Sequence, residues 1–155
     1  MKKLNSSDIE IAVAEMFNPR INIIVPNVWW GLGLNYEADL IIVSGSRYAT
    51  EIEIKVSAND IKADLKKRWF THRSDKIRRF YYAVPDYLQD CEHLPSDCGL
   101  IVVDENLNCK TIRAPRITKH ARKLSDKEVS KLLHLGCMRI WSLKKIINSR
   151  RMIEG

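Results

Sequence analysis

Three of the four acidic residues in the stretch 35–57, NYEADLIIVSGSRYATEIEIKVS, form a pattern with its lysine. Glu51, Glu53 and Lys55 occupy every second position, and Asp39 stands before an aliphatic run. Carboxylates beside a lysine can bind a divalent cation and activate a water molecule against a phosphodiester. The pattern is therefore either an ordinary amphipathic hairpin or a metal-dependent hydrolytic site.

Two strands, at 37–44 and 48–57, must position these side chains. Gly45-Ser46-Arg47 between them is a hairpin signal. Side chains alternate along the second strand, so its isoleucines face the core while Glu53 and Lys55 face the other way. A three-residue connection places Asp39 directly across from Glu53, whereas a two-residue turn would put Asp39 on the opposite face.

Two ionised carboxylates at this distance repel each other, and one pKa rises unless a cation lies between them. Mg²⁺ or Mn²⁺ suits the position, because hard cations bind carboxylates, waters and phosphate oxygens. We expect Asp39 and Glu53 as direct ligands, with the backbone carbonyl of Ile54 as a third. Lys55 would orient the metal-bound water and offset charge on the phosphorane.

Asp39, a hairpin and then Glu53-Ile54-Lys55 resemble the signature of the PD-(D/E)XK nuclease superfamily. The stretches EIKVSANDIKADLKKRW, RRFYYAVP and LPSDCGLIVVDE are similar to the MmcB-like DNA repair proteins, a branch of that superfamily. This resemblance covers residues 37–104. It implies a metal-dependent DNA nuclease with the acids and lysine of the signature in its active site.

The sequence departs from the superfamily pattern in places. Ala38 stands where other members have a proline that makes no metal contact. Glu51 is an additional acid that could bind a second metal ion, but we expect it at the edge of the sheet. Some members supply a further carboxylate from the first helix, and Glu10 is our candidate. The alternative role for Glu10 is a capping box with Ser7.

The chain is expected to form one α/β domain over residues 1–155, restriction-endonuclease-like, with an αβββαβ core and a mixed sheet flanked by helices. The core spans about 6–113, and a basic helical extension covers 114–155. The expected elements are a helix at 7–17, strands at 20–25, 37–44 and 48–57, a helix at 60–69, strands at 78–85 and 98–104, an edge strand at 109–114, and a helical region from Ser125 that is broken near Gly136.

The formal net charge of +7 is unevenly distributed. Residues 1–57 hold five Lys/Arg and seven Asp/Glu, a balance of −2, whereas residues 58–155 hold twenty-one and twelve, a balance of +9. An acid-rich site in a basic body suits a polyanion such as DNA. No apolar run approaches the roughly 18 residues of a membrane span and no signal peptide is evident, so we expect a cytoplasmic protein.

Basic residues gather in two clusters, at 62–79 and 113–123. Such clusters bind phosphates without reading sequence, although a merely solvated surface is the alternative. A tryptophan in the loop before the hairpin could stack on an unpaired base or close the core. The candidate DNA-binding residues are Lys62, Lys66, Lys67, Arg73, Arg78, Arg116 and Trp30.

The four cysteines are scattered without a CxxC pair, and we expect thiols. A zinc site formed by Cys91, His93, Cys98 and Cys109 is the alternative, although these spacings match no usual zinc motif.

The sequence thus predicts a Mg²⁺- or Mn²⁺-dependent DNA endonuclease for repair or recombination. It would select DNA by structure, because no sequence-reading module is evident. One alternative is a catalytically silent accessory protein that binds DNA, and another is an interaction or toxin–antitoxin component that meets an acidic protein. RNA also stays open as substrate. No nucleotide cofactor is expected, and the apolar face of the last helix could form either core or a homodimer interface.

Overall fold

The computed structural model describes residues 3–71 and 74–154, without the side chains of 67–71. Its centre is a six-stranded mixed sheet in the order β1-β2-β3-β4-β5-β6. The β3–β4 and β4–β5 pairs are parallel and the other pairs are antiparallel. The predicted order of elements is confirmed. The elements are α1 (Ser6–Met16), β1 (Ile23–Val28), β2 (Ala38–Val43), β3 (Ala49–Ile54), α2 (Ala58–Thr71), β4 (Ile77–Pro85), η1 (Asp86–Leu88), β5 (Gly99–Val103), β6 (Cys109–Arg113) and α3 (Asp126–Glu154).

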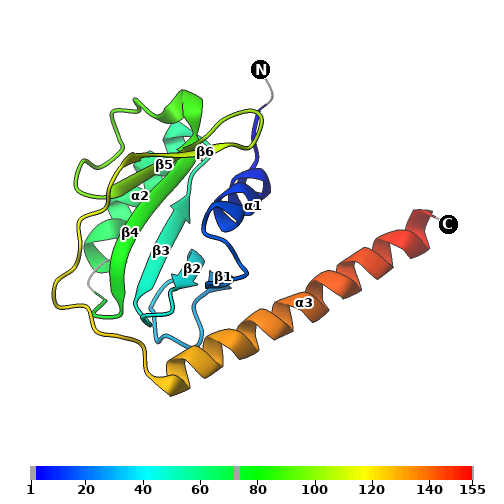
Figure 1. The fold of residues 1–155 in the computed structure, drawn as a ribbon. Coiled ribbons are helices and arrows are strands. Elements are labelled where there is room, and N and C mark those ends of the chain that lie inside the picture. Colours follow the sequence, from blue (N-terminus) through cyan, green and yellow to red (C-terminus); the bar gives the residue numbers. More distant parts are fainter. Residues whose placement is uncertain (1–2, 72–73, 155) are drawn as a thin grey trace.

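Helices cover both faces of the sheet (Figure 1). On one face, α1 packs its buried Ile9 into a cluster with Leu40 and Ile52. On the other face, α2 packs Ile61 into a cluster with Tyr82. Because side chains alternate along a strand, Glu51 and Glu53 of β3 point to the α2 face. The acids therefore lie between two layers of structure.

The N-terminus of α1 differs from the prediction. The side chain of Asn5 accepts a hydrogen bond from the Asp8 backbone N–H at 2.9 Å, and Asp8 accepts one from the Asn5 N–H at 3.0 Å. This reciprocal capping box begins the helix two residues before the expected one. The predicted capping box of Ser7 and Glu10 is therefore wrong, and Glu10 is available for another role.

Strand β1 also differs, because it continues through Pro26 instead of ending there. Pro26 pairs with Leu40 of β2, and the strand extends to Val28. A proline lacks the N–H that a central strand would need, but β1 lies at the edge of the sheet. At an edge, that missing donor costs no ladder bond.

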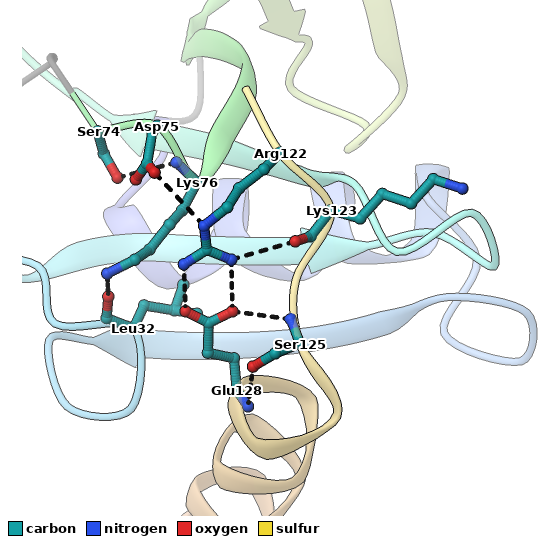
Figure 2. Close-up of polar contacts among 8 residues, drawn as sticks. All are labelled: Leu32, Ser74, Asp75, Lys76, Arg122, Lys123, Ser125 and Glu128. Carbon is teal, nitrogen blue, oxygen red and sulfur yellow. Dashed lines mark hydrogen bonds and ion pairs between the residues drawn. The ribbon is translucent and has the colours of Figure 1, made fainter. Parts of the chain in front are cut away.

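The start of α3 is fixed to the body by polar contacts (Figure 2). Ser125 and Glu128 form a capping box at the predicted start of this helical region, with hydrogen bonds of 2.8 and 3.2 Å. Arg122 lies 2.7 Å from a Glu128 oxygen and 3.4 Å from an Asp75 oxygen, and it lowers the pKa of Glu128 to about 2. These contacts link the helix to the segment before β4.

The predicted break of α3 at Gly136 does not occur. A Cβ at Gly136 would lie 3.9 Å from Val25 of β1, so the glycine sits where the helix meets the sheet. Leu132 and Leu135 are buried there. Beyond residue 139 every described side chain of α3 is exposed, and this part extends away from the other elements (Figure 1). Within the described chain, no helix is both long enough and apolar enough to cross a membrane.

Candidate active site

The register of β2 and β3 brings Asp39 and Glu53 together. The two strands are joined by residues 44–48, an odd number, and Leu40 pairs with Ile52. One step further along this antiparallel ladder, Asp39 lies across from Glu53 on the same face. The prediction that both carboxylates share a face is therefore confirmed.

Asp39 is anchored by the backbone of the opposite strand. Its Oδ2 accepts a hydrogen bond of 2.7 Å from the Ile54 N–H. Burial raises the pKa of Asp39, while the Ile54 N–H and the Lys55 ammonium act to lower it. The net direction is upward, so the site disfavours the ionised carboxylate when no cation is bound.

Glu53 is 7% exposed. Burial and the negative charge of Asp39 raise its pKa to about 8. This is the electrostatic conflict expected of paired carboxylates, and either a proton or a cation relieves it. The position therefore has the charge that attracts a divalent ion.

Lys55 follows β3 and turns its ammonium back toward the acids. Its Nζ lies 3.1 Å from an oxygen of Glu53 and 3.3 Å from an oxygen of Asp64. Burial lowers the pKa of Lys55, but these carboxylates outweigh burial and raise it. Lys55 is held as a cation beside the acidic pair, as the sequence predicted.

Asp64 is a site residue that sequence reasoning missed. It comes from α2, where its second oxygen accepts a short hydrogen bond from the hydroxyl of Tyr82 in β4. A signal existed, because Asp64 follows Ile61 by three residues and so lies on the same side of the helix. Ile61 is buried and faces the sheet.

Glu51 was expected at the edge of the sheet, and that expectation is wrong. The side chain is 0% exposed and lies in the sheet interior. Tyr36, in the loop before β2, donates a hydrogen bond of 2.6 Å to Glu51 Oε2. The other oxygen, Oε1, is buried with no hydrogen-bond partner in the described chain. Burial raises the pKa of Glu51 to about 7.

Glu10 lies on α1, on the opposite face of the sheet from Glu53. It is half-buried, and its pKa is raised first by burial and then by the charge of Asp39. The negative charge of Asp39 therefore acts on Glu10. This position is compatible with the additional carboxylate that we expected from the first helix.

The donor set suits a hard cation. Asp39 and Glu53 offer carboxylate oxygens, and Mg²⁺ typically uses one or two protein carboxylates and completes its shell with water and substrate oxygens. Over residues 3–71 and 74–154, no three His, Cys, Asp or Glu side chains gather to form a metal cage. The same finding speaks against the zinc alternative. All four cysteines are thiols, with Cys98 buried and Cys137 exposed.

The predicted DNA-binding residues divide into two regions. Lys62 and Lys66 are exposed on α2, which begins three residues after Lys55. Lys67 belongs to the same helix, but its side chain lies outside the described residues, as does the whole of Arg73. The α2 lysines are thus near the acidic pair along the chain and available to solvent.

Arg78 lies at the opposite end of β3 and β4 from the acidic pair. In the parallel β3–β4 pair, Thr50 is aligned with Arg79 and Ile54 with Ala83. Four residues separate these levels, about 13 Å along a strand. The guanidinium of Arg78 lies 3.9 Å from the ring centre of Tyr48.

Two arginines of the second basic cluster have structural contacts instead. Arg113 donates to the carbonyls of Pro95 and Cys98 at 2.6 and 2.7 Å. Arg122 holds the start of α3, as described above. Arg116, by contrast, is exposed.

Trp29 and Trp30 do not close the core. Trp29 is 62% exposed and Trp30 is 45% exposed. The Trp30 ring lies 6.2 Å from the His134 ring and 5.9 Å from the Lys131 ammonium, both on α3. A partly exposed aromatic ring beside a cation can accept a stacked base.

Comparison with known proteins gives a fold neighbour and a family. No curated protein matches the chain. The solved structure of SPO1766, a protein of unknown function from Silicibacter pomeroyi, matches with a TM-score of 0.65 and 18% identity, covering 100% of this chain and 97% of that one. At this identity the likeness shows the α/β fold. The model of the MmcB-like DNA repair proteins matches residues 8–142. The chain therefore belongs to the MmcB-like family of DNA repair proteins.

Proposed function

We propose that the protein is a divalent-metal-dependent DNA nuclease of the PD-(D/E)XK type that hydrolyses phosphodiester bonds in repair. One observation carries the proposal: Asp39 and Glu53 share a face of the sheet, with the Lys55 ammonium 3.1 Å from Glu53. An exposed ion-pair ladder is the ordinary alternative. Such cross-strand pairs stabilise a sheet by only about 0.2–1 kcal/mol, which is small compared with the free-energy cost of burying carboxylates.

Each residue has a specific task in this proposal. Asp39 and Glu53 would hold Mg²⁺ or Mn²⁺, with the Ile54 carbonyl as a further ligand. A bound divalent ion supplies a lowered water pKa and offsets phosphate charge. Lys55 orients the attacking water and counters the negative charge that grows on the phosphoryl oxygens. Asp64 and Glu53 together hold the ammonium in place.

DNA is the proposed substrate, because the family is one of DNA repair proteins and the body of the chain is basic. Lys62, Lys66 and Arg116 would contact phosphates. Trp30 would stack on a base that is unpaired, as at a branch or a damaged position. These contacts read charge and shape, so we propose a structure-selective endonuclease.

The test is cleavage of plasmid, junction and single-stranded DNA in Mg²⁺ and in Mn²⁺. Native protein should cut, and Lys55→Ala and Glu53→Gln should lower the rate by about 10²–10³-fold. The matched control is Lys110→Ala, an exposed lysine of β6, which should leave the rate unchanged. DNA binding in EDTA and circular dichroism establish that each variant is folded and still binds.

Other outcomes have definite meanings. Equal cleavage by native protein and both site variants would indicate a contaminating nuclease. Salt-sensitive DNA binding with no cleavage in either metal would favour the catalytically silent accessory protein. The interaction or toxin–antitoxin alternative predicts no salt-sensitive affinity for DNA at all.

A further inference from the structure

The C-terminal part of α3, residues 140–154, leaves a row of large aliphatic side chains uncovered. We call this segment the outer half of α3. Figure 1 shows it extending beyond the sheet. Isolated helices of this length are marginal in water, and exposed apolar rows of this kind mark interaction surfaces. The exposed fractions are 54% for Ile140, 58% for Leu143, 49% for Ile146, 53% for Ile147 and 85% for Ile153.

The spacing along α3 is that of a coiled-coil seam. From residue 129 onward, the positions at alternating intervals of three and four residues lie on one side of the helix. This average period of about 3.5 residues is the one that lets two helices stay in contact along their length. The α3 seam consists of Val129, Leu132, Gly136, Arg139, Leu143, Ile146, Arg150 and Ile153.

The inner half of this seam already serves as a packing surface. Leu132 is fully buried in a cluster with Val25 of β1. Arg139 donates a hydrogen bond of 2.7 Å to the carbonyl of Asn27. The exposed positions Leu143, Ile146 and Ile153 continue the same side of the helix past the end of the sheet. The seam is thus one continuous surface, covered in its first half and open in its second.

The flanks of the open seam carry no charge until the final turn. Ile140 and Ile147 lie on one flank, and Ser142 and Ser149 lie on the other. The serine hydroxyls donate to the Met138 and Lys145 carbonyls at 3.2 and 2.9 Å. Because these donors are satisfied within the helix, a second helix can cover them without leaving them unpaired.

The basic residues of the outer half mostly point elsewhere. At helical spacing, Lys144, Lys145 and Arg151 fall on the side opposite the seam, and all three are exposed. Charged flanks are what normally make two identical helices repel or select an oppositely charged partner. Because the flanks of the open seam are uncharged before the final turn, they neither attract an acidic partner nor repel a second copy of the same helix.

We propose that the outer half of α3 packs in antiparallel orientation against the same segment of a second copy of this chain. A parallel pair would bring the Arg150 side chains of the two copies together. An antiparallel offset instead pairs Leu143 with the second copy's Ile153, and Ile146 with the second copy's Arg150. The aliphatic stem of Arg150 covers apolar surface while its guanidinium reaches water.

The test is the mass in solution of the full chain over a range of concentrations, by light scattering and sedimentation equilibrium. The nucleic-acid-free protein is measured in about 1 M NaCl, where the Debye length is only about 3 Å and DNA bridging is suppressed. Native protein should approach twice 18.0 kDa as concentration rises. The double variant Leu143→Glu/Ile146→Glu should remain at 18.0 kDa.

The matched control is Trp141→Glu, a larger apolar side chain that is 65% exposed on the opposite side of the same helix. It should dimerise like the native protein. Both replaced seam residues are exposed in the single chain, so circular dichroism should show every variant folded. A native mass of one chain at all concentrations would overturn the proposal, as would equal loss of dimer in the seam and control variants.

Orientation is tested by disulfide trapping in a Cys137→Ser background. Chains with Leu143→Cys and chains with Ile153→Cys should form mixed disulfides when combined, because the antiparallel offset places these positions together. Predominant self-linking of Leu143→Cys chains would contradict the antiparallel arrangement. None of these measurements depends on DNA cleavage, so the dimer and the proposed nuclease stand or fall separately.

Discussion

Asp64 Oδ1 lies 3.3 Å from the Nζ of Lys55, so a residue of α2 holds the lysine that β3 delivers to the acidic pair. The other Asp64 oxygen accepts the hydroxyl hydrogen bond of Tyr82 from β4. The lysine therefore depends on three elements for its position. Two carboxylates on one ammonium also keep it charged, which suits the countering of negative charge more than proton abstraction.

Replacing Asp64 by asparagine should weaken this hold on Lys55. We expect cleavage to slow by about 10–100-fold, as is typical when a residue that orients a catalytic group is changed. KM for DNA should change little, because Asp64 is not part of the phosphate-binding surface. The control is Asp60→Asn, an exposed acid in the first turn of α2. Equal effects on kcat in both variants would argue against a positioning role.

Stability without metal should depend on pH in a defined direction. The folded-state pKa values of Glu51 and Glu53, about 7 and about 8, lie above the ordinary value of 4.5. Between about pH 4.5 and 8 the folded chain therefore binds more protons than the unfolded chain, and the free energy of unfolding falls as pH rises. Below this window both states are protonated and the penalty is absent.

Thermal denaturation in EDTA at about pH 5 and about pH 8 measures this effect. The Tm should be lower at the higher pH, and Glu53→Gln should reduce the difference. Mg²⁺ should raise the Tm mainly at the higher pH, where the carboxylates are free to bind it. The control is Glu105→Gln, an exposed acid that should leave the pH dependence unchanged. A Tm that rises steadily across this window would contradict the prediction.

The Tyr36–Glu51 hydrogen bond should be worth a measurable part of the stability. Tyr36→Phe would leave a buried carboxylate without this donor, at a cost of about 1–3 kcal/mol in the free energy of unfolding. Urea denaturation near pH 8 measures the loss. Tyr87→Phe, at a side chain that is 41% exposed, should cost almost nothing. The prediction is wrong if both variants unfold at the same urea concentration as native protein.

DNA affinity should fall as the salt concentration rises. The slope of log affinity against log salt should show whether the lysines of α2 contact phosphates. Each of Lys62→Ala and Lys66→Ala should reduce the slope of log affinity against log salt by about one, since each removes one phosphate contact. Fluorescence anisotropy with labelled junction DNA gives the slope. Arg20→Ala, an exposed residue after α1, is the control. Slopes that stay at the native value in both lysine variants would remove α2 from the DNA surface.

The geometry of the acidic pair could be predicted from sequence only in part. Alternation along the strand places Asp39 across from Glu53 if the number of connecting residues is odd, but the sequence leaves that number open, and the register of β2 and β3 decides it. The surroundings of Glu51 could not be predicted in this way. The burial of Glu51 depends on Tyr36, which lies in the loop before β2, and on the elements that cover this face of β3. The spacing of residues in the sequence does not indicate that these parts meet Glu51.

In the fold, too, some features could be predicted from local sequence and others could not. The Ser125–Glu128 capping box was recognisable because both residue types are common at such positions. At α1, the pattern predicted a capping box at Ser7 and Glu10, whereas the structure forms it at Asn5 and Asp8, which stand at the same spacing. Gly136 was read as a break, since glycine weakens helices. In the structure α3 continues through Gly136, and a Cβ there would meet Val25 of β1 only at an ordinary contact distance of 3.9 Å.

Pro26 has a consequence for the behaviour of the protein at high concentration. It sits in β1, whose outer side has no neighbouring strand in the sheet. An edge strand can recruit strands of other molecules and lead to fibrous deposits. A residue without an amide hydrogen interrupts the row of donors that such growth requires. This protein therefore has a built-in guard against edge-to-edge polymerisation on that side.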